Sequence, residues 1–294
     1  MFRHTELSGG EHMAWALERV PVAAGVLPEG PHWDAAAGGV YWVDIPGGRV
    51  HFLDESGGQR SWEVGQPVAA VAGRAGGGLV LAVRDGFAAL DLATGQVSAL
   101  AGVEPDRPGN RMNDEACDRA GRFFAGTKAE DDAPGAGALY RLDPDHVVTL
   151  VVAGVTISNG IGWSPDEQLM YYVDSPTRRV DVFDYDPASG AIGGRRPFAR
   201  LPSADAMPDG LAVDAEGGVW VALWGGSAVH RYDAAGRLDQ VVEVPHVNVT
   251  SCAFGGPGLD LLYVTAAAGP GAAEGALYRG PAGVAGLPAY PFRG

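Results

Sequence analysis

A six-fold internal repeat runs through most of this chain and constrains its fold more than any other feature. Each unit begins with a short apolar strand, continues with a run of β-branched and aromatic residues, and ends in a third strand after a turn. The units start 39 to 50 residues apart, at Glu29, Val68, Asn113, Asn159, Asp209 and Thr250. A period of this length, with several short strands in each unit, is typical of propeller blades. The sequence therefore predicts an all-β fold, a six-bladed β-propeller.

A propeller has no internal domain boundary, because each blade buries its faces against its neighbours. We therefore expect a single domain over residues 14–294, preceded by a flexible polar extension over residues 1–13. The segment from Ala14 to Leu27 precedes the first unit, and we expect it to complete the last blade as a closing strand. The 45 glycines and 21 prolines are spread along the chain, as expected for many tight turns.

The composition excludes several classes of partner. A net charge of −15 without any basic run disfavours nucleic acid and anionic membranes. No segment approaches the roughly 18 apolar residues of a membrane span. Glu18 and Arg19 interrupt the apolar stretch near the N-terminus, unlike a secretory signal, so a cytoplasmic protein is expected. Cys117 and Cys252 are flanked by apolar residues and are expected to be buried core thiols.

The first residues of the units occupy equivalent positions on the innermost strands, so they should form a ring at one end of the central channel. Polar side chains stand there at Glu29, Asn113, Asn159 and Asp209. Two buried carboxylates repel each other unless a cation lies between them. The oxygen donors of Glu29, Asn159 and Asp209 suit one hard divalent cation such as Ca²⁺ or Mg²⁺. Either asparagine alone could instead form a local turn, but polar residues at four equivalent positions favour a metal site.

Arg111 lies two residues before Asn113, so both side chains should point the same way on an extended strand. Its guanidinium could bind substrate hydroxyls or a developing oxyanion beside the metal. It could equally form a salt bridge at the channel mouth with Glu130 or Asp131. The spacing alone leaves both interpretations open.

No other catalytic motif competes with the metal site. The chain contains no GxSxG elbow, no phosphate-binding loop and no histidine pattern typical of zinc enzymes. Four of the tryptophans occupy repeat-core positions and should pack in the interior: Trp33, Trp42, Trp163 and Trp220. Trp224 follows its strand and is expected to face the pocket.

Five segments, in order and at the right spacing, resemble a known family: regucalcin (senescence marker protein), gluconolactonase and luciferin-regenerating-enzyme-like proteins. The segments are PEGPHW at 28–33, RMND and GRFFAGT within 111–127, SNGI at 158–161, PDG at 208–210 and TSCAFGG at 250–256. The resemblance covers nearly the whole chain, from about residue 15 to residue 290.

The resemblance implies a six-bladed propeller that holds one divalent ion through Glu29, Asn159 and Asp209. It also implies that Arg111 and Asn113 contact the substrate. A further acidic contact falls on Asp131, although Glu130 is next to it. The implied activity is hydrolysis of small lactones, commonly aldonolactones such as gluconolactone, to the acid. Ca²⁺ is the favoured ion, with Zn²⁺, Mg²⁺ and Mn²⁺ as alternatives.

In the expected mechanism Asp209 is the general base that accepts a proton from the attacking water. The metal polarises the lactone carbonyl, and Arg111 and Asn113 orient the substrate hydroxyls. Two alternatives remain: a broader esterase or organophosphatase on the same propeller, or a Ca²⁺-binding regulatory protein without enzymatic activity. The sequence leaves the oligomeric state open.

Overall fold

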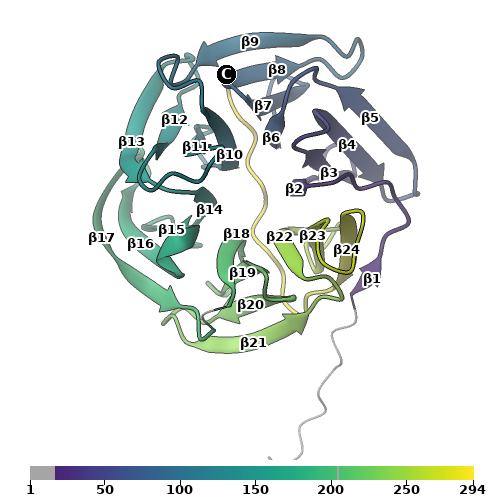
Figure 1. Cartoon of the computed structure of the whole chain (residues 1–294), viewed down its shortest axis with the longest axis vertical. Coiled ribbons are helices and arrows are strands. Elements are labelled where there is room, and N and C mark those ends of the chain that lie inside the picture. The colour runs from purple at the N-terminus through teal and green to yellow at the C-terminus, as the bar shows by residue number, and fades with distance from the viewer. Residues whose placement is uncertain (1–16, 204) are drawn as a thin grey trace, which may run out of the picture.

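The computed structural model describes residues 17–203 and 205–294 and shows six four-stranded antiparallel sheets around a central channel (Figure 1). This arrangement confirms the predicted six-bladed β-propeller. The expected extension over residues 1–13 lies outside the described residues. No helix in the described part is long and apolar enough to cross a membrane.

Within blades 1 to 5 the strands run in chain order from the channel to the outer edge. Blade 1 contains β2 (Pro28–Asp34), β3 (Gly39–Asp44), β4 (Arg49–Asp54) and β5 (Gln59–Glu63). Blade 2 contains β6 (Val68–Gly73), β7 (Leu79–Val83), β8 (Gly86–Leu90) and β9 (Val97–Gly102). Blade 3 contains β10 (Asn110–Cys117), β11 (Phe123–Ala129), β12 (Gly137–Leu142) and β13 (Val148–Val155). Blade 4 contains β14 (Ser158–Trp163), β15 (Leu169–Asp174), the 3₁₀ helix η1 (Ser175–Thr177), β16 (Arg179–Asp186) and β17 (Ala191–Arg200). Blade 5 contains β18 (Met207–Val213), β19 (Val219–Trp224), β20 (Ala228–Tyr232) and β21 (Leu238–Glu243).

Blade 6 combines the two ends of the chain. It contains β22 (Asn248–Gly255), β23 (Leu261–Ala267) and β24 (Ala276–Pro281), and its outer strand is β1 (Glu18–Arg19). β1 pairs antiparallel with β24, and the next residue, Val20, donates its backbone N–H to the carbonyl of Leu277 at 2.8 Å. The predicted closing strand is therefore confirmed, and it joins the first blade to the last.

The outer strands carry the weakest sequence signal. β5, β9, β13, β17 and β21 have exposed or partly exposed side chains at nearly every position. The second strands of the same blades are buried at nearly every position, and β3 and β7 are buried at every one. An outer strand has no neighbouring strand beyond it, so it needs few apolar residues. The repeat therefore shows three strands per unit in sequence, although each blade has four.

The faces of adjacent blades meet in an apolar core. Trp42 and Trp220 are fully buried and Trp33 nearly so, as predicted. Trp163 is only partly buried, and its ring packs edge-on against Phe124 at 5.4 Å between centroids. The two thiols differ, since Cys252 is buried whereas Cys117 is partly exposed.

Each inner strand has a register shift at the level of the predicted ring. The shifts fall between residues 29 and 32, 68 and 70, 112 and 115, 158 and 161, 208 and 211, and 249 and 251. A bulge of this kind re-aims the side chain at the extra residue. Glycine follows the ring residue where the inner strands come closest. A Cβ on Gly160 would lie 2.8 Å from the carbonyl oxygen of Asp209.

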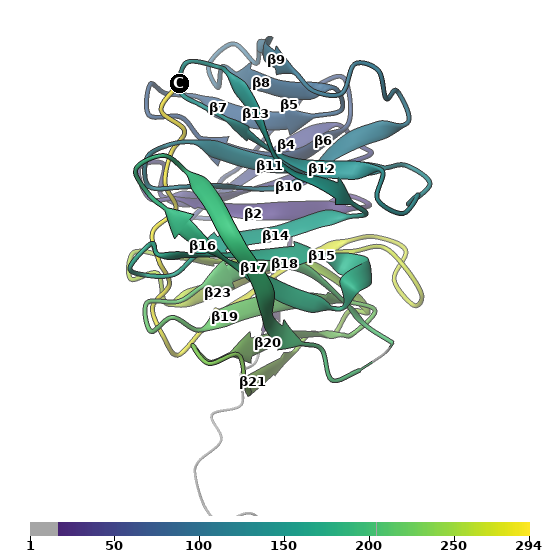
Figure 2. The same cartoon turned by 90° about the vertical axis from the view of Figure 1, so that its left-hand side faces the viewer.

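Residues 282–294 leave blade 6 and cross one end of the channel, as the yellow trace shows in Figure 1 and along one edge of the molecule in Figure 2. The N–H of Leu287 bonds to the carbonyl of Val213 in blade 5 at 3.3 Å. The N–H of Phe292 bonds to the carbonyl of Gly73 in blade 2 at 2.9 Å. The C-terminal segment thus connects blades on opposite sides of the ring.

We expect Phe292→Ala to lower the free energy of unfolding by about 3 to 5 kcal/mol, because its fully buried ring packs near Phe123 and its removal leaves a cavity. Equilibrium denaturation in urea would measure the change. Leu150→Ala is the control, since Leu150 is 55% exposed and its truncation should change stability by less than about 0.5 kcal/mol. Equal stability of the Phe292→Ala variant and the wild type would show that the C-terminal segment does not brace the ring.

Candidate metal centre

A cavity of about 180 Å³ opens at the end of the channel where the inner strands begin. Four ring positions with polar residues contribute to its wall, and Arg111 contributes from the same strand as Asn113. The structure thus brings together five of the predicted site residues: Glu29, Arg111, Asn113, Asn159 and Asp209. The remaining two ring positions differ, because Val68 packs in the core and Thr250 bonds to the carbonyl of Pro28 at 2.7 Å.

A chain of hydrogen bonds orders the amide side chains of this cavity. Nη1 of Arg111 donates to Oδ1 of Asn113 at 2.8 Å. Nδ2 of Asn113 donates to Oδ1 of Asn159 at 2.6 Å, and Nδ2 of Asn159 donates to Oγ of Ser175 at 2.7 Å. A carbonyl oxygen has two lone pairs. Oδ1 of Asn159 can therefore accept the bond from Asn113 and still coordinate an ion.

Glu29 and Asp209 are buried in the cavity wall without a salt bridge to any described residue. Burial raises the pKa of Glu29 well above its usual range, and the nearby charges of Asp209 and Asp114 raise it further. Burial and repulsion from Asp114 likewise raise the pKa of Asp209, while Lys128 and Arg111 act in the opposite direction. Two carboxyl groups are therefore held where their ionised forms are destabilised.

The donor set fits a hard divalent cation. Glu29, Asp209 and Asn159 offer only oxygen atoms, which Ca²⁺ and Mg²⁺ prefer. Among the described residues no three acidic, histidine or cysteine side chains converge as metal ligands, so an amide oxygen would have to complete the set. A cation here would also relieve the repulsion between the two carboxylates.

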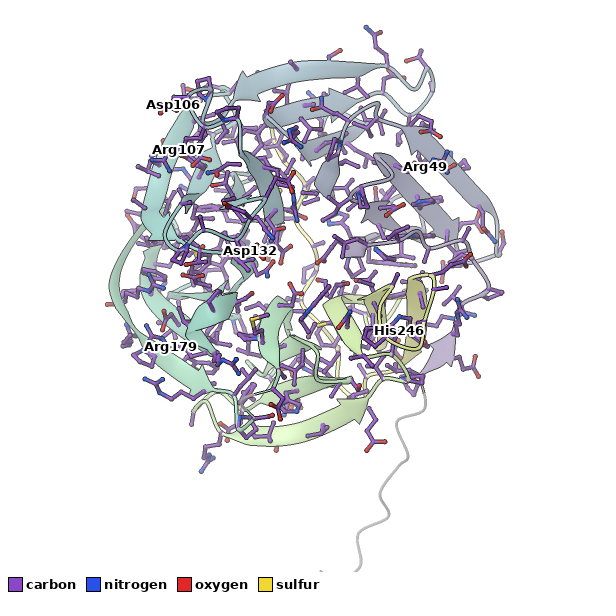
Figure 3. The ribbon with its side chains drawn as sticks, viewed as in Figure 1. Arg49, Asp106, Arg107, Asp132, Arg179 and His246 are labelled. Atoms are coloured by element: carbon purple, nitrogen blue, oxygen red, sulfur yellow. The ribbon has the colours of Figure 1, made fainter. Side chains whose placement is uncertain are left out.

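The loop after β11 differs from the expectation in one respect. Asp131 is exposed, its Oδ1 accepts a hydrogen bond from the N–H of Ala133 at 3.2 Å, and it is not among the cavity-lining residues. Asp132 lines the cavity instead, and Figure 3 shows it near the central opening. Its left-handed backbone, with φ of 57°, makes the turn there. Arg111 is placed for both roles that the sequence left open, substrate binding and a salt bridge at the channel mouth. It lines the cavity, and its Nε lies 3.7 Å from Oε2 of Glu130.

The sequence interpretation did not include Lys128 and Ser175, which also line the cavity. Lys128 lies on β11 directly opposite Arg111 on β10, and it forms an ion pair with Asp132. Ser175 begins η1 and binds the amide of Asn159. The alternation of β11 would have suggested Lys128 only if the register of the β10–β11 pair had been known. Trp224 lines the cavity, as expected.

A family model described as "SMP-30/Gluconolactonase/LRE-like region" matches residues 27–268 of the chain. This protein belongs to that family. Regucalcin of Oryctolagus cuniculus is 40% identical over 292 residues, covering 92% of this chain and 97% of the relative. The family model spans all the ring residues, from Glu29 to Thr250.

Solved structures of family members superpose closely. A luciferin-regenerating enzyme gives a TM-score of 0.90 at 31% identity, covering 95% of this chain and 99% of the other. The calcium-binding protein regucalcin from Agrobacterium tumefaciens gives 0.88 at 31% identity, covering 95% and 98%. A gluconolactonase from Xanthomonas campestris gives 0.74 at 26% identity, covering 88% and 87%.

We expect Glu29→Gln to stabilise the protein in the presence of a chelator at pH 8. The carboxyl of Glu29 has a raised pKa in the folded state, so the wild type loses stability as pH rises from the unfolded value of about 4.3 through the folded value. The glutamine variant lacks this loss and should be more stable by about 1 to 2 kcal/mol at pH 8.

Urea unfolding at pH 8 and pH 5 would test this sign. The difference should shrink at pH 5, because lowering the pH toward the raised pKa of Glu29 in the folded state protonates its carboxyl group. A variant less stable than wild type at pH 8 in chelator would contradict the destabilisation of ionised Glu29 by burial and by the neighbouring carboxyl groups.

Proposed function

We propose that this protein is a divalent-metal-dependent hydrolase that opens small lactones, of the sugar aldonolactone type, to the corresponding acids. The observation that carries the proposal is the convergence of Glu29, Asn159 and Asp209 with the side chains of Arg111 and Asn113 in one cavity. The similarity to a gluconolactonase supports the same reaction.

We propose Ca²⁺ as the ion, with Zn²⁺, Mg²⁺ and Mn²⁺ as alternatives. The all-oxygen ligand set of Glu29, Asn159 and Asp209 supports a hard cation, and one similar structure is that of a calcium-binding protein. A bound divalent cation would supply Lewis acidity toward the lactone carbonyl oxygen.

The side chains of the cavity supply the proton transfer and the orientation of the substrate. A carboxylate oxygen of Asp209 accepts a proton from the attacking water, because a carboxylate in a poorly solvated wall is a stronger base than an exposed one. Nη1 of Arg111 is held by its bond to Oδ1 of Asn113, so the remaining N–H groups of the guanidinium are fixed before the substrate arrives. Both N–H groups of Asn113 are used within the protein, by the carbonyl of Ser158 at 2.8 Å and by Oδ1 of Asn159 at 2.6 Å, which leaves its carbonyl oxygen as the group that can bind substrate. Asn113 accepts a hydrogen bond from a substrate hydroxyl, and Arg111 donates to hydroxyl groups and stabilises negative charge on oxygen.

A second candidate is a Ca²⁺-binding protein without catalytic activity. It is favoured by the similarity to regucalcin and to a structure whose name states calcium binding. Both candidates use the same ion and the same ligands, so only turnover separates them.

We expect the purified protein to hydrolyse gluconolactone faster than the spontaneous rate, to lose this activity in chelator and to regain it when Ca²⁺ is restored. A pH-indicator assay with sugar lactones, aryl esters and phosphotriesters would measure it. Turnover of esters or phosphotriesters but not of lactones would instead support the broader esterase. Ca²⁺-induced thermal stabilisation without any turnover would support the binding protein.

We expect Asp209→Ala to abolish turnover, because it removes both a metal ligand and the general base. Arg111→Ala should lower kcat/KM by a factor on the order of 10². Asp145→Ala, which removes an exposed carboxylate between β12 and β13, is the control and should leave kcat/KM unchanged. Wild-type lactone hydrolysis by the Asp209→Ala variant would make the assignment of the base wrong.

The assignment of the acidic substrate contact needs a separate pair of variants. Asp132 lines the cavity and Asp131 does not. We expect Asp132→Asn to change KM for gluconolactone by more than about threefold and Asp131→Asn to leave it unchanged. The opposite ranking would restore Asp131 as the substrate contact implied by the family motif.

A further inference from the structure

Lys128 is the one lysine of the chain, which otherwise carries twenty arginines as its cationic side chains. It does not lie on the surface, where lysine is usually found, because its side chain is only 14% exposed. It lines the cavity of the candidate metal centre, opposite Arg111 across the β10–β11 pair. An ammonium is a compact charge with three rotatable donors, so an arginine cannot simply replace it there.

Near the mouth of the cavity, apolar and cationic side chains line different sides of the wall. Three apolar residues line the cavity, and each lies two positions before one of the predicted metal ligands in the sequence. They are Leu27 before Glu29, Ile157 before Asn159 and Met207 before Asp209. The equivalent residue of blade 3 is Arg111, and Lys128 stands beside it. One side of the mouth is therefore cationic, and the sides formed by blades 1, 4 and 5 are apolar.

The two cations differ in how many of their donors are used. Arg111 donates to the carbonyl of Met112 and to Asn113 and lies near Glu130. Lys128 pairs with Asp132, and no other described side chain accepts a hydrogen bond from it. An ammonium has three N–H groups, so two of them remain for a molecule in the cavity.

The lining also carries an excess of positive charge. A divalent cation would balance Glu29 and Asp209, which leaves Arg111, Lys128 and Asp132 as the charged lining residues. Their sum is one positive charge. Asp114, whose charge acts on both Glu29 and Asp209, lines a different cavity together with Glu115 and Cys117. An anionic group that enters the cavity would complete the balance on the side formed by blade 3.

Glu130 does not remove this excess. Its Oε1 lies 3.0 Å from Nη1 of Arg84, while its Oε2 lies 3.7 Å from Nε of Arg111. One carboxylate is thus shared between two guanidinium groups. It is also 47% exposed, so water screens its charge.

We propose that Lys128 is a specificity-determining residue that binds an anionic group of the lactone, a carboxylate or a phosphate, at the mouth of the cavity on the side formed by blade 3. The proposal rests on the proposed lactonase function and narrows it. The preferred substrates are lactones of sugar acids that carry a second acidic group. The neutral aldonolactones are poorer substrates of the same cavity.

Steady-state kinetics with gluconolactone, glucarolactone and 6-phosphogluconolactone test this preference. Lys128→Met removes the charge and keeps the length of the side chain, and Lys128→Arg keeps the charge. We expect Lys128→Met to lower kcat/KM for the preferred anionic lactone at least about tenfold, mainly through KM, and for gluconolactone by less than about threefold. Lys128→Arg should recover part of the loss, and added salt should weaken the preference of the wild type.

The two anionic lactones distinguish a carboxylate from a phosphate as the group that Lys128 binds. An equal loss of kcat/KM on the neutral and both anionic substrates would overturn the proposal, because Lys128 would then act only on folding or on the metal centre. No loss with either anionic lactone would overturn it as well.

A binding experiment separates this proposal from the lactonase function. Protein labelled with ¹³Cε-lysine gives a single side-chain signal, because Lys128 is the chain's one lysine. We expect the Ca²⁺-loaded protein to show a saturable shift of this signal with glucarate or 6-phosphogluconate and a smaller one with gluconate. Asp132→Asn releases the ammonium and should tighten the binding of the anionic acids.

The outcomes remain distinct. A signal that responds to the anionic acids in a protein that hydrolyses no lactone would support the anion site and reject the lactonase. Lactone hydrolysis with no charge preference and no differential shift would leave the lactonase standing and overturn the role of Lys128.

Discussion

The repulsion between two carboxyl groups held in one poorly solvated wall is the constraint on which the site depends. Glu29 and Asp209 come from blades 1 and 5, and nothing in their local sequence holds them together. They meet because six inner strands approach the same axis and each has a bulge at the same level. The ring must remain closed for them to stay close. The closing strand and the C-terminal segment therefore support the site as well as the fold.

The sequence predicted much of this architecture because residues at the same place in each repeat unit occupy the same place in each blade. The six units, the ring residues and the closing strand were all visible from strand patterns and turn residues. The outer strands were not, since a strand at the sheet edge needs no apolar signature. Asp131 illustrates a second limit. The family motif points to it, but a left-handed turn brings the next residue, Asp132, to the cavity.

Lys128 shows the third limit. Its position in the cavity depends on which residue of β10 it faces, and strand register is not apparent from either strand alone. The floor of the cavity consists of residues that the family motifs identify, whereas its mouth is formed by Leu27, Ile157, Met207 and the blade 3 cations. A change at the mouth therefore alters what the cavity can admit without altering the residues of its floor.

The ring is completed by β1, which precedes blade 1 in the sequence, and by the segment that follows blade 6. β1 must wait for β24 before it can pair, and residues 282–294 then bond to Val213 and Gly73 across the ring. Domains of this size begin to fold during synthesis, so blades 1 to 5 emerge with exposed edges and no partner for β1. The circle can close only once blade 6 has been synthesised, and the charge-bearing cavity at its centre is complete only in the closed ring.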